Sequence, residues 1–290
     1  MESLPTVATA GTVPLLADFS LEMTGKDVAK LEEARHAIPA GTRVNVTFLG
    51  NESLELRLAA ARAVKQLGLV PVPHISARRL PSRAAFSEFL ARLQEDGTGE
   101  SVFVVGGDPD TPAGPYQDSL ALIGSGLLEE HGVRHVGISG YPEGHPVISG
   151  PQLWSALGAK HALLAEHGLS GGITTQFGFD TQPVLAWIEA VRRRGIDLPV
   201  RVGVPGPAGV RRLLAYAGRF GVGTSAGIAR KYGLSLTNLM GTAGPDRFVR
   251  ALADDLDPHR HGQVDMHFYP FGGLKATSDW VAAFTKENHS

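Results

Sequence analysis

The feature that most constrains this chain is a regular alternation of short β-rich runs with longer amphipathic stretches. The runs are rich in Val, Ile, Phe and Thr, and they recur about every 25 to 35 residues, which is typical of linked βα units around a parallel sheet. One such unit contains the helical stretch 53–68, in which Leu54, Leu58, Ala61 and Val64 recur at helical spacing. The eight predicted strands span residues 15–22, 43–48, 70–75, 101–106, 135–140, 171–177, 199–204 and 264–271.

Eight strands, each followed by a helix, predict a (β/α)₈ TIM barrel, with a doubly wound open sheet as the rival. The rival needs a G-x-G-x-x-G turn after its first strand, and the sequence "FSLEMTGKD" has one Gly there. Residues 220–262 exceed one helix and loop, so we expect an extra helical segment before the last strand. We predict a single barrel domain over residues 1–290, with residues 1–13 as a loose N-terminal tail.

Composition excludes several classes of function. The chain has 27 Lys and Arg against 29 Asp and Glu and no basic run, so we expect no nucleic-acid partner. It has no Cys, which removes disulfides, thiolate nucleophiles and Cys-bound metal centres. We expect no signal peptide and no membrane partner, and hence a cytoplasmic protein. Its expected partners are small-molecule substrates, and the sequence leaves open whether the chain forms a homo-oligomer.

Polar residues stand where the predicted strands end. In a TIM barrel the active site lies at the C-terminal face of the strands, so these residues are expected to converge on one mouth. Each has an ordinary structural role as well, because a strand-end Asp often caps the next helix and a single His is often structural. The candidates are Glu22, Thr47, His74, Asp108, Tyr141, His145, Gln176 and the turn from Phe271 to Lys275.

Several reaction classes can be weighed from these residues. A metal-dependent hydrolase using His74, Asp108 and His145 stays open, although the only H-x-H, His259 and His261, falls in a polar segment that we interpret as a solvated loop. No G-x-S-x-G elbow, no Walker-type loop and no strand lysine is found. Redox chemistry by a bound organic cofactor is compatible with the remaining polar groups.

Four segments carry a resemblance to a known family. "GGDPDTPAGPYQDS", "GISGYPEGHP", "ITTQFGFD" and "DMHFYPF" resemble the R-G-D-x-P, A-x-Y-P-E-x-H-P, I-T-Q-F-x-F-D and H-F-Y-T-x-N-R segments of bacterial 5,10-methylenetetrahydrofolate reductases. Thinner similarity in "FSLEM", "VTFLG" and "PHIS" extends the match, in order, over most of residues 15–280. Members of that family are FAD-dependent TIM barrels.

The resemblance implies an enzyme that passes hydride from NADH or NADPH through FAD to 5,10-methylenetetrahydrofolate, giving 5-methyltetrahydrofolate. Glu22 matches the acid that protonates the departing amine, and Asp108 matches the aspartate beside the flavin, which stabilises the cationic folate. Gln176 matches the amide that binds the pterin, and Phe271 falls in the substrate-binding turn. The matched flavin contacts are Thr47, His74, Gly106, Gly107, Asp108, Tyr116, Tyr141 and His145, with Lys160 a candidate for the FAD phosphates.

The chain departs from the family pattern at functional positions. Gly106 replaces the Arg before Gly-Asp, and the Arg that would meet the folate glutamate tail is absent from the last segment. Lys275 or Arg230 is a candidate replacement, and Tyr216 is a candidate to stack on the dinucleotide. A non-catalytic flavin- or folate-binding homologue and a flavin-free reductase therefore remain alternatives beside the metal hydrolase.

Overall fold

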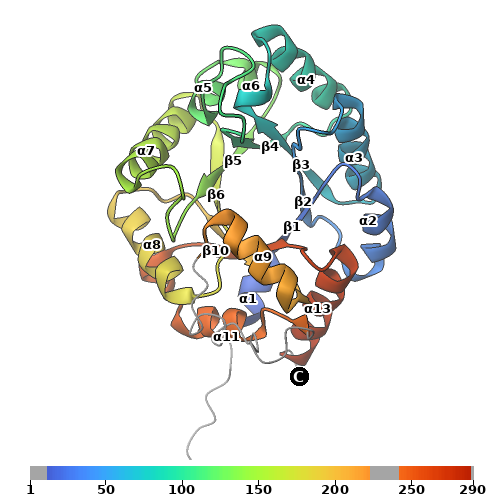
Figure 1. The fold of residues 1–290 in the computed structure, drawn as a ribbon, viewed down its shortest axis with the longest axis vertical. Helices are drawn as coiled ribbons and strands as arrows, with labels where there is room; N and C mark the ends of the chain where they lie inside the picture. The colour runs from blue at the N-terminus through green and yellow to red at the C-terminus, as the bar shows by residue number, and fades with distance from the viewer. Residues whose placement is uncertain (1–11, 223–241, 289–290) are drawn as a thin grey trace, which may run out of the picture.

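The computed structural model describes residues 12–222 and 242–288, in which eight parallel strands close into a barrel (Figure 1). Their order around the barrel is β1-β10-β7-β6-β5-β4-β3-β2, so the last strand pairs with the first. The (β/α)₈ prediction is confirmed. The barrel strands are β1 (Ser20–Met23), β2 (Arg43–Val46), β3 (Val70–Ser76), β4 (Ser101–Val105), β5 (His135–Gly140), β6 (Ser170–Thr175), β7 (Val200–Pro205) and β10 (Val264–Tyr269).

Helices form a ring outside the barrel (Figure 1). None of the helices in the described part of the chain is both long and apolar enough to span a membrane. The helices are α1 (Thr12–Ala17), α2 (Val28–Ala34), α3 (Leu54–Gln66), α4 (Arg83–Glu95), α5 (Ser119–Ile123), α6 (Leu127–Glu130), α7 (Gly150–Glu166), α8 (Thr181–Arg193), α9 (Val210–Phe220), α11 (Asp246–Asp255), α12 (Pro258–His261) and α13 (Leu274–Glu287), with short 3-10 turns η1 (Arg35–Ala37) and η2 (Ala77–Arg79).

Seven of the eight predicted strands agree with the structure to within two residues at each end. The prediction for 15–22 is wrong in its first half, because Leu15 and Leu16 belong to α1 and the strand begins at Ser20. Both leucines are buried, and α1 packs against β10 and α11. The predicted tail 1–13 is two residues too long, since α1 begins at Thr12, and residues 1–11 lie outside the described part.

The predicted helical segment 220–262 is borne out where it is described, by α11 and α12, while residues 223–241 lie outside the described part. A small antiparallel pair, β8 (Ala208–Gly209) and β9 (Thr242–Ala243), was not predicted. The interpretation of His261 as a solvated loop residue is wrong. It lies in α12, 1% exposed, and its Nδ1 accepts a hydrogen bond from the backbone N–H of Asp257 at 2.9 Å.

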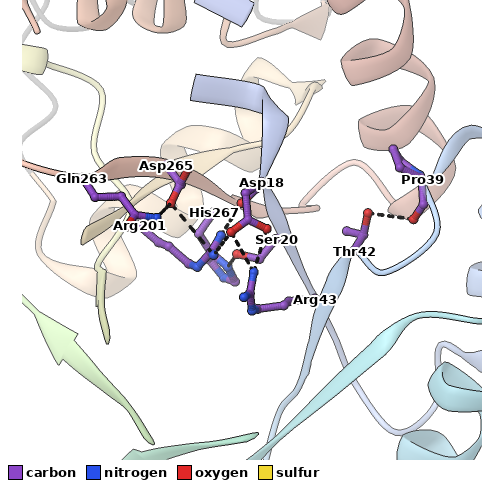
Figure 2. A network of polar contacts seen from close by, with 9 residues as sticks. All are labelled: Asp18, Ser20, Pro39, Thr42, Arg43, Arg201, Gln263, Asp265 and His267. Atoms are coloured by element: carbon purple, nitrogen blue, oxygen red, sulfur yellow. Dashed lines mark hydrogen bonds and ion pairs between the residues drawn. The ribbon is translucent and has the colours of Figure 1, made fainter. Parts of the chain in front are cut away.

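An ionic network crosses the N-terminal end of the barrel (Figure 2). Arg201 on β7 donates to Asp18 Oδ2 at 2.7 Å and lies 4.0 Å from Asp265 on β10, and Arg43 on β2 donates to both oxygens of Asp18. Burial pushes the pKa of Asp18 upward, but the hydrogen bonds and charges of Arg201 and Arg43 outweigh it and hold that pKa below its usual value. The network links β2, β7 and β10 at the end remote from the expected site.

Candidate functional site

A cavity of about 770 Å³ opens at the C-terminal ends of the barrel strands. Its wall is made by strand ends, by the loop after β10 and by one face of α9, which lies across the mouth (Figure 1). This is the end of the barrel at which TIM-barrel active sites are found. Seven of the residues selected from the sequence line it: Glu22, Thr47, His74, Tyr141, Gln176, Tyr216 and Phe271.

Two glycines make room for rings inside the barrel. A Cβ on Gly137 of β5 would lie 2.4 Å from the ring of Phe103, and one on Gly203 of β7 would lie 2.8 Å from the ring of Tyr269. Both distances are shorter than van der Waals contact allows, so any side chain at these positions would displace the rings. Glycine on β5 and β7 therefore leaves the space in which Phe103 and Tyr269 line the cavity.

The floor of the cavity holds one carboxylate between two imidazoles. Glu22 Oε2 lies 4.0 Å from Nε2 of His74 and 3.8 Å from Nε2 of His267. Asn45 Nδ2 donates to the same Nε2 of His74 at 3.2 Å, whereas Ser20 Oγ hydrogen-bonds the other ring nitrogen of His267, Nδ1, at 2.8 Å. Nε2 of His267 is fully buried and finds no hydrogen-bond partner among the described residues, so it directs a polar atom toward Glu22.

Burial decides the charge of the groups around Glu22. Burial lowers the pKa of His74 to about 4, although the negative charge of Glu22 acts to raise that pKa. The nearby His267 also acts to lower it. His74 is therefore a neutral imidazole at physiological pH. Burial also raises the pKa of Tyr269 well above its usual value, with the charge of Glu22 acting in the same direction, so its phenol stays protonated and donates to the carbonyl of Thr175 at 3.0 Å.

The pH dependence of stability should report the buried state of His74. Its folded pKa is about 4 and its unfolded pKa about 6.5, so the unfolded chain binds the extra proton between these values. The free energy of unfolding is expected to fall as the pH is lowered through this window. A His74→Gln variant should flatten that slope in urea unfolding measured from pH 4 to 7. An unchanged slope would contradict the assigned protonation state.

An aromatic wall stands beside the polar floor. Gln176, directly after β6, accepts the backbone N–H of Phe177 on its Oε1 at 3.1 Å, which fixes the direction of its amide. The ring of Phe177 meets that of Phe271 edge-on at 5.1 Å, and Phe271 in turn stacks on Tyr216 of α9 at 3.9 Å and 9°. A flat ligand that reaches Gln176 would therefore lie against aromatic side chains.

The structure does not bring Asp108 into the cavity. Its side chain is 80% exposed, and its Oδ1 accepts a hydrogen bond from Arg79 at 2.6 Å. Gly106 and Gly107 lie outside the lining as well. Gly107 has φ 96°, and a Cβ there would lie 2.2 Å from Ser76 Oγ, so the turn and the close contact account for this glycine without a ligand.

Other predicted cofactor contacts also lie away from the cavity lining. Tyr116 is 6% exposed and packs edge-on against Phe86, and His145 contacts the ring of Tyr141 from the loop after β5. Lys160 lies on α7, where burial lowers its pKa and the charge of Asp118 opposes that shift. None of these three residues lines the cavity.

The two cations suggested for the acidic tail do not supply it in the described structure. Lys275 pairs with Asp279 on the exposed side of α13 and does not line the cavity, whereas Arg230 lies outside the described residues. The described part of the chain also holds no group of three or more His, Asp or Glu arranged to bind a metal ion. The set His74, Asp108 and His145 of the hydrolase alternative is therefore not assembled.

Among the lining and floor residues that were not selected from the sequence are His267, Tyr269, Arg212 and Arg219. His267 and Tyr269 alternate with buried Phe268 along β10, and this two-residue period in "DMHFY" was an available signal. Arg212 and Arg219 line the cavity from α9 together with Tyr216, at spacings of four and three residues that place them on one helical face.

Comparison with known proteins supports the fold. No protein-family profile matches the chain. Over 94% of its length it is similar to a Clostridium thermocellum protein that binds two copies of 5-methyl-5,6,7,8-tetrahydrofolic acid, with 9% identity, a TM-score of 0.58 and 96% of that chain covered. Identity this low shows a shared fold and no more.

Two further structures are less similar, with TM-scores below 0.5. A 3-dehydroquinate dehydratase from Aquifex aeolicus has 10% identity and a TM-score of 0.45, with 93% of this chain and 98% of that chain covered. The dihydropteroate synthase of Thermus thermophilus has 13% identity and a TM-score of 0.49, with 93% of each chain covered.

Proposed function

We propose that this protein binds a reduced folate in the cavity at the barrel mouth and reduces its one-carbon unit from methylene to methyl. The observation that carries the proposal is the carboxyl group of Glu22 on the floor, between two buried imidazoles, in a cavity that the amide of Gln176 also lines. The ordered motifs shared with methylenetetrahydrofolate reductases support it. So does the C. thermocellum protein, which binds 5-methyltetrahydrofolate on a similar fold.

The reaction requires a proton and a hydride at separate atoms. Glu22 takes up a proton from solvent and donates it to N10 of methylenetetrahydrofolate as the bond from the methylene carbon to N10 breaks, which leaves a cationic iminium at N5. Hydride then adds to the methylene carbon and gives the N5-methyl product. The carboxylate left on Glu22 stabilises the cation, and the neutral imidazole of His74 adds no opposing charge.

The hydride comes from a reduced organic carrier, NADH or NADPH, directly or through FAD. Thr47, His74 and Tyr141 fit the ring of a flavin because they line the cavity. The rest of the predicted flavin set fits less well, since the ring of Tyr116 is packed against Phe86 and Asp108 is paired with Arg79.

A folate-binding protein without turnover is the second candidate. The position of Asp108 favours it, because the carboxylate expected to stabilise the reacting folate is exposed and ion-paired outside the cavity. This candidate predicts that the protein binds a reduced folate but does not consume the hydride donor.

One experiment separates these functions. The purified protein is examined for flavin absorbance, mixed anaerobically with NADH or NADPH, and then given methylenetetrahydrofolate. Oxidation of the donor with formation of 5-methyltetrahydrofolate would support the reductase. Binding without turnover would favour the second candidate, and neither binding nor turnover would exclude both.

A further inference from the structure

The polar groups beneath Glu22 form a stripe along two neighbouring strands. Ser20 of β1 pairs in register with His267 of β10, and because side chains alternate between the two faces of a strand, Ser20 and Glu22 share one face. Asp265 shares the face of His267 in the same way. Ser20 is 1% exposed and His267 is fully buried, so this stripe runs through the interior of the barrel, away from the cavity mouth.

The stripe reaches solvent at the opposite end of the barrel. Asp18 and Asp265 belong to the ionic network at the N-terminal end, where both lie within 4.0 Å of Arg201. Figure 2 shows that network together with Ser20 and His267. The side chain of Asp18 is 44% exposed. Polar side chains therefore extend from solvent at the N-terminal end to the carboxyl group on the cavity floor.

The two imidazoles that flank Glu22 are held by different chemical groups. Asn45 Nδ2 donates to Nε2 of His74, so this nitrogen is an acceptor and the ring proton is confined to Nδ1. Nδ1 of His267 instead meets a hydroxyl group, Ser20 Oγ, at 2.8 Å. A hydroxyl group both donates and accepts, so Ser20 stabilises either tautomer of His267, whereas the amide NH₂ group stabilises one tautomer of His74.

Only one of these imidazoles suits the transfer of a proton to Glu22. Nε2 of His267 lies 3.8 Å from Glu22 Oε2 and has no hydrogen-bond partner among the described residues. Nε2 of His74 lies 4.0 Å from the same oxygen, but Asn45 occupies its lone pair. A shift of less than about 1 Å would bring His267 to hydrogen-bond distance of the carboxyl group.

We propose that His267 returns a proton to Glu22 in each catalytic cycle, and that Ser20 positions the ring and relays the proton from the N-terminal side of the barrel. This inference rests on the proposed function, in which Glu22 gives its proton to N10. The N–H bond at Nε2 of His267 breaks as an O–H bond forms at Oε2 of Glu22. In the same movement Nδ1 takes the hydroxyl proton of Ser20, which recovers one from solvent along the stripe. The net change is one proton taken from solvent, with no transfer of electrons, and it can occur while a ligand fills the cavity.

The test separates the first turnover from the later ones. The full chain is mixed with NADH or NADPH and methylenetetrahydrofolate, and 5-methyltetrahydrofolate is measured by rapid quench. His267→Gln should form the first equivalent of product at a nearly normal rate, because Glu22 starts with its proton, and should then slow by about 100-fold, the lower limit for a positioned proton-transfer group. Ser20→Ala should act in the same direction. Ser20→Thr, which keeps the hydroxyl group, should restore the later turnovers.

His74→Gln is the matched control, because it makes the same change beside the same carboxyl group. It should alter the first and the later turnovers by the same factor. An equal loss in both phases of His267→Gln would overturn the inference, since it would mark a structural role. No loss in either phase would also overturn it, because Glu22 would then be protonated from the mouth. Absence of product from the unmodified chain would overturn the proposed function itself.

A second measurement does not depend on turnover. In NMR spectra of the full chain labelled with ¹⁵N-histidine, the ring nitrogens of His267 should exchange between two tautomers, whereas His74 should keep its proton on Nδ1. The spectra of His267→Gln and His74→Gln assign the signals, and circular dichroism shows whether each variant is folded. If His267→Gln does not fold, Ser20→Ala and Ser20→Thr decide the result. A single fixed tautomer of His267 in the unmodified chain would show that the inference is wrong.

Discussion

Replacing Glu22 by Gln is expected to slow the formation of 5-methyltetrahydrofolate by about 100- to 10,000-fold, the usual contribution of a positioned general acid. The amide has nearly the same shape but no acidic proton, and His74, 4.0 Å away, cannot replace it because burial keeps that imidazole neutral. Oxidation of the hydride donor by an alternative acceptor should be nearly unchanged. Stopped-flow measurement of the two half-reactions checks both statements.

Asp27→Asn is the matched control for this variant. Asp27 lines the same cavity but lies on the rim, where its carboxylate accepts hydrogen bonds from Lys30 and Thr24. The same change of carboxylate to amide should therefore have a small effect on methyl formation. Equal loss in both half-reactions of Glu22→Gln, or an effect of Asp27→Asn as large as that of Glu22→Gln, would contradict the acid role.

Asp108→Asn tests the role that the family resemblance implies. The structure holds Asp108 outside the cavity in an exposed ion pair with Arg79, so its carboxylate does not reach the ligand and we expect less than about fivefold change in folate reduction, about 1 kcal/mol in activation free energy. A loss comparable to that of Glu22→Gln, with normal donor oxidation, would show that the loop brings this carboxylate to the ligand during turnover.

The barrel could be predicted from the sequence because each strand is a short apolar run bounded by turn residues. The first strand was misplaced because Leu15 and Leu16 satisfy a strand and a buried helix equally well, and local pattern cannot decide between them. Packing of α1 against β10 decides it. Strand-end side chains such as Glu22 and Gln176 could be selected because a parallel barrel brings all strand ends to one face.

The conformation of loops and the partners of charges could not be predicted in the same way. The position of Asp108 depends on Arg79, which is 29 residues away in the sequence and belongs to the short turn after β3. Helix α9 contacts the loop after β10 through the stacking of Tyr216 on Phe271, a contact between residues 55 positions apart. Both features come from tertiary contacts that local periodicity does not encode.

Replacing Arg201 by Met is expected to lower the free energy of unfolding by about 3 to 5 kcal/mol, the cost of leaving a buried charge without its partner. Arg201 is 16% exposed and serves both Asp18 and Asp265, and the side chain of Asp265 is 9% exposed (Figure 2). Arg43→Met is the matched control. Arg43 and Asp18 are 36% and 44% exposed, so its loss should cost about 1 kcal/mol or less.

The loss in Arg201→Met should also depend on pH. Burial already raises the pKa of Asp265, and the charge of Arg201 opposes that shift, so removal of Arg201 raises the pKa further. A carboxyl group whose pKa is raised on folding destabilises the protein as the pH rises through that pKa, so the destabilisation should shrink on acidification. Adding Asp265→Asn should recover part of the loss at neutral pH, because it removes a buried carboxylate that would keep only the hydrogen bond from Gln263. Urea unfolding of the single and double variants at pH 5 and pH 7 measures this, and an equal loss in Arg43→Met and Arg201→Met would show that burial does not set the strength of this network.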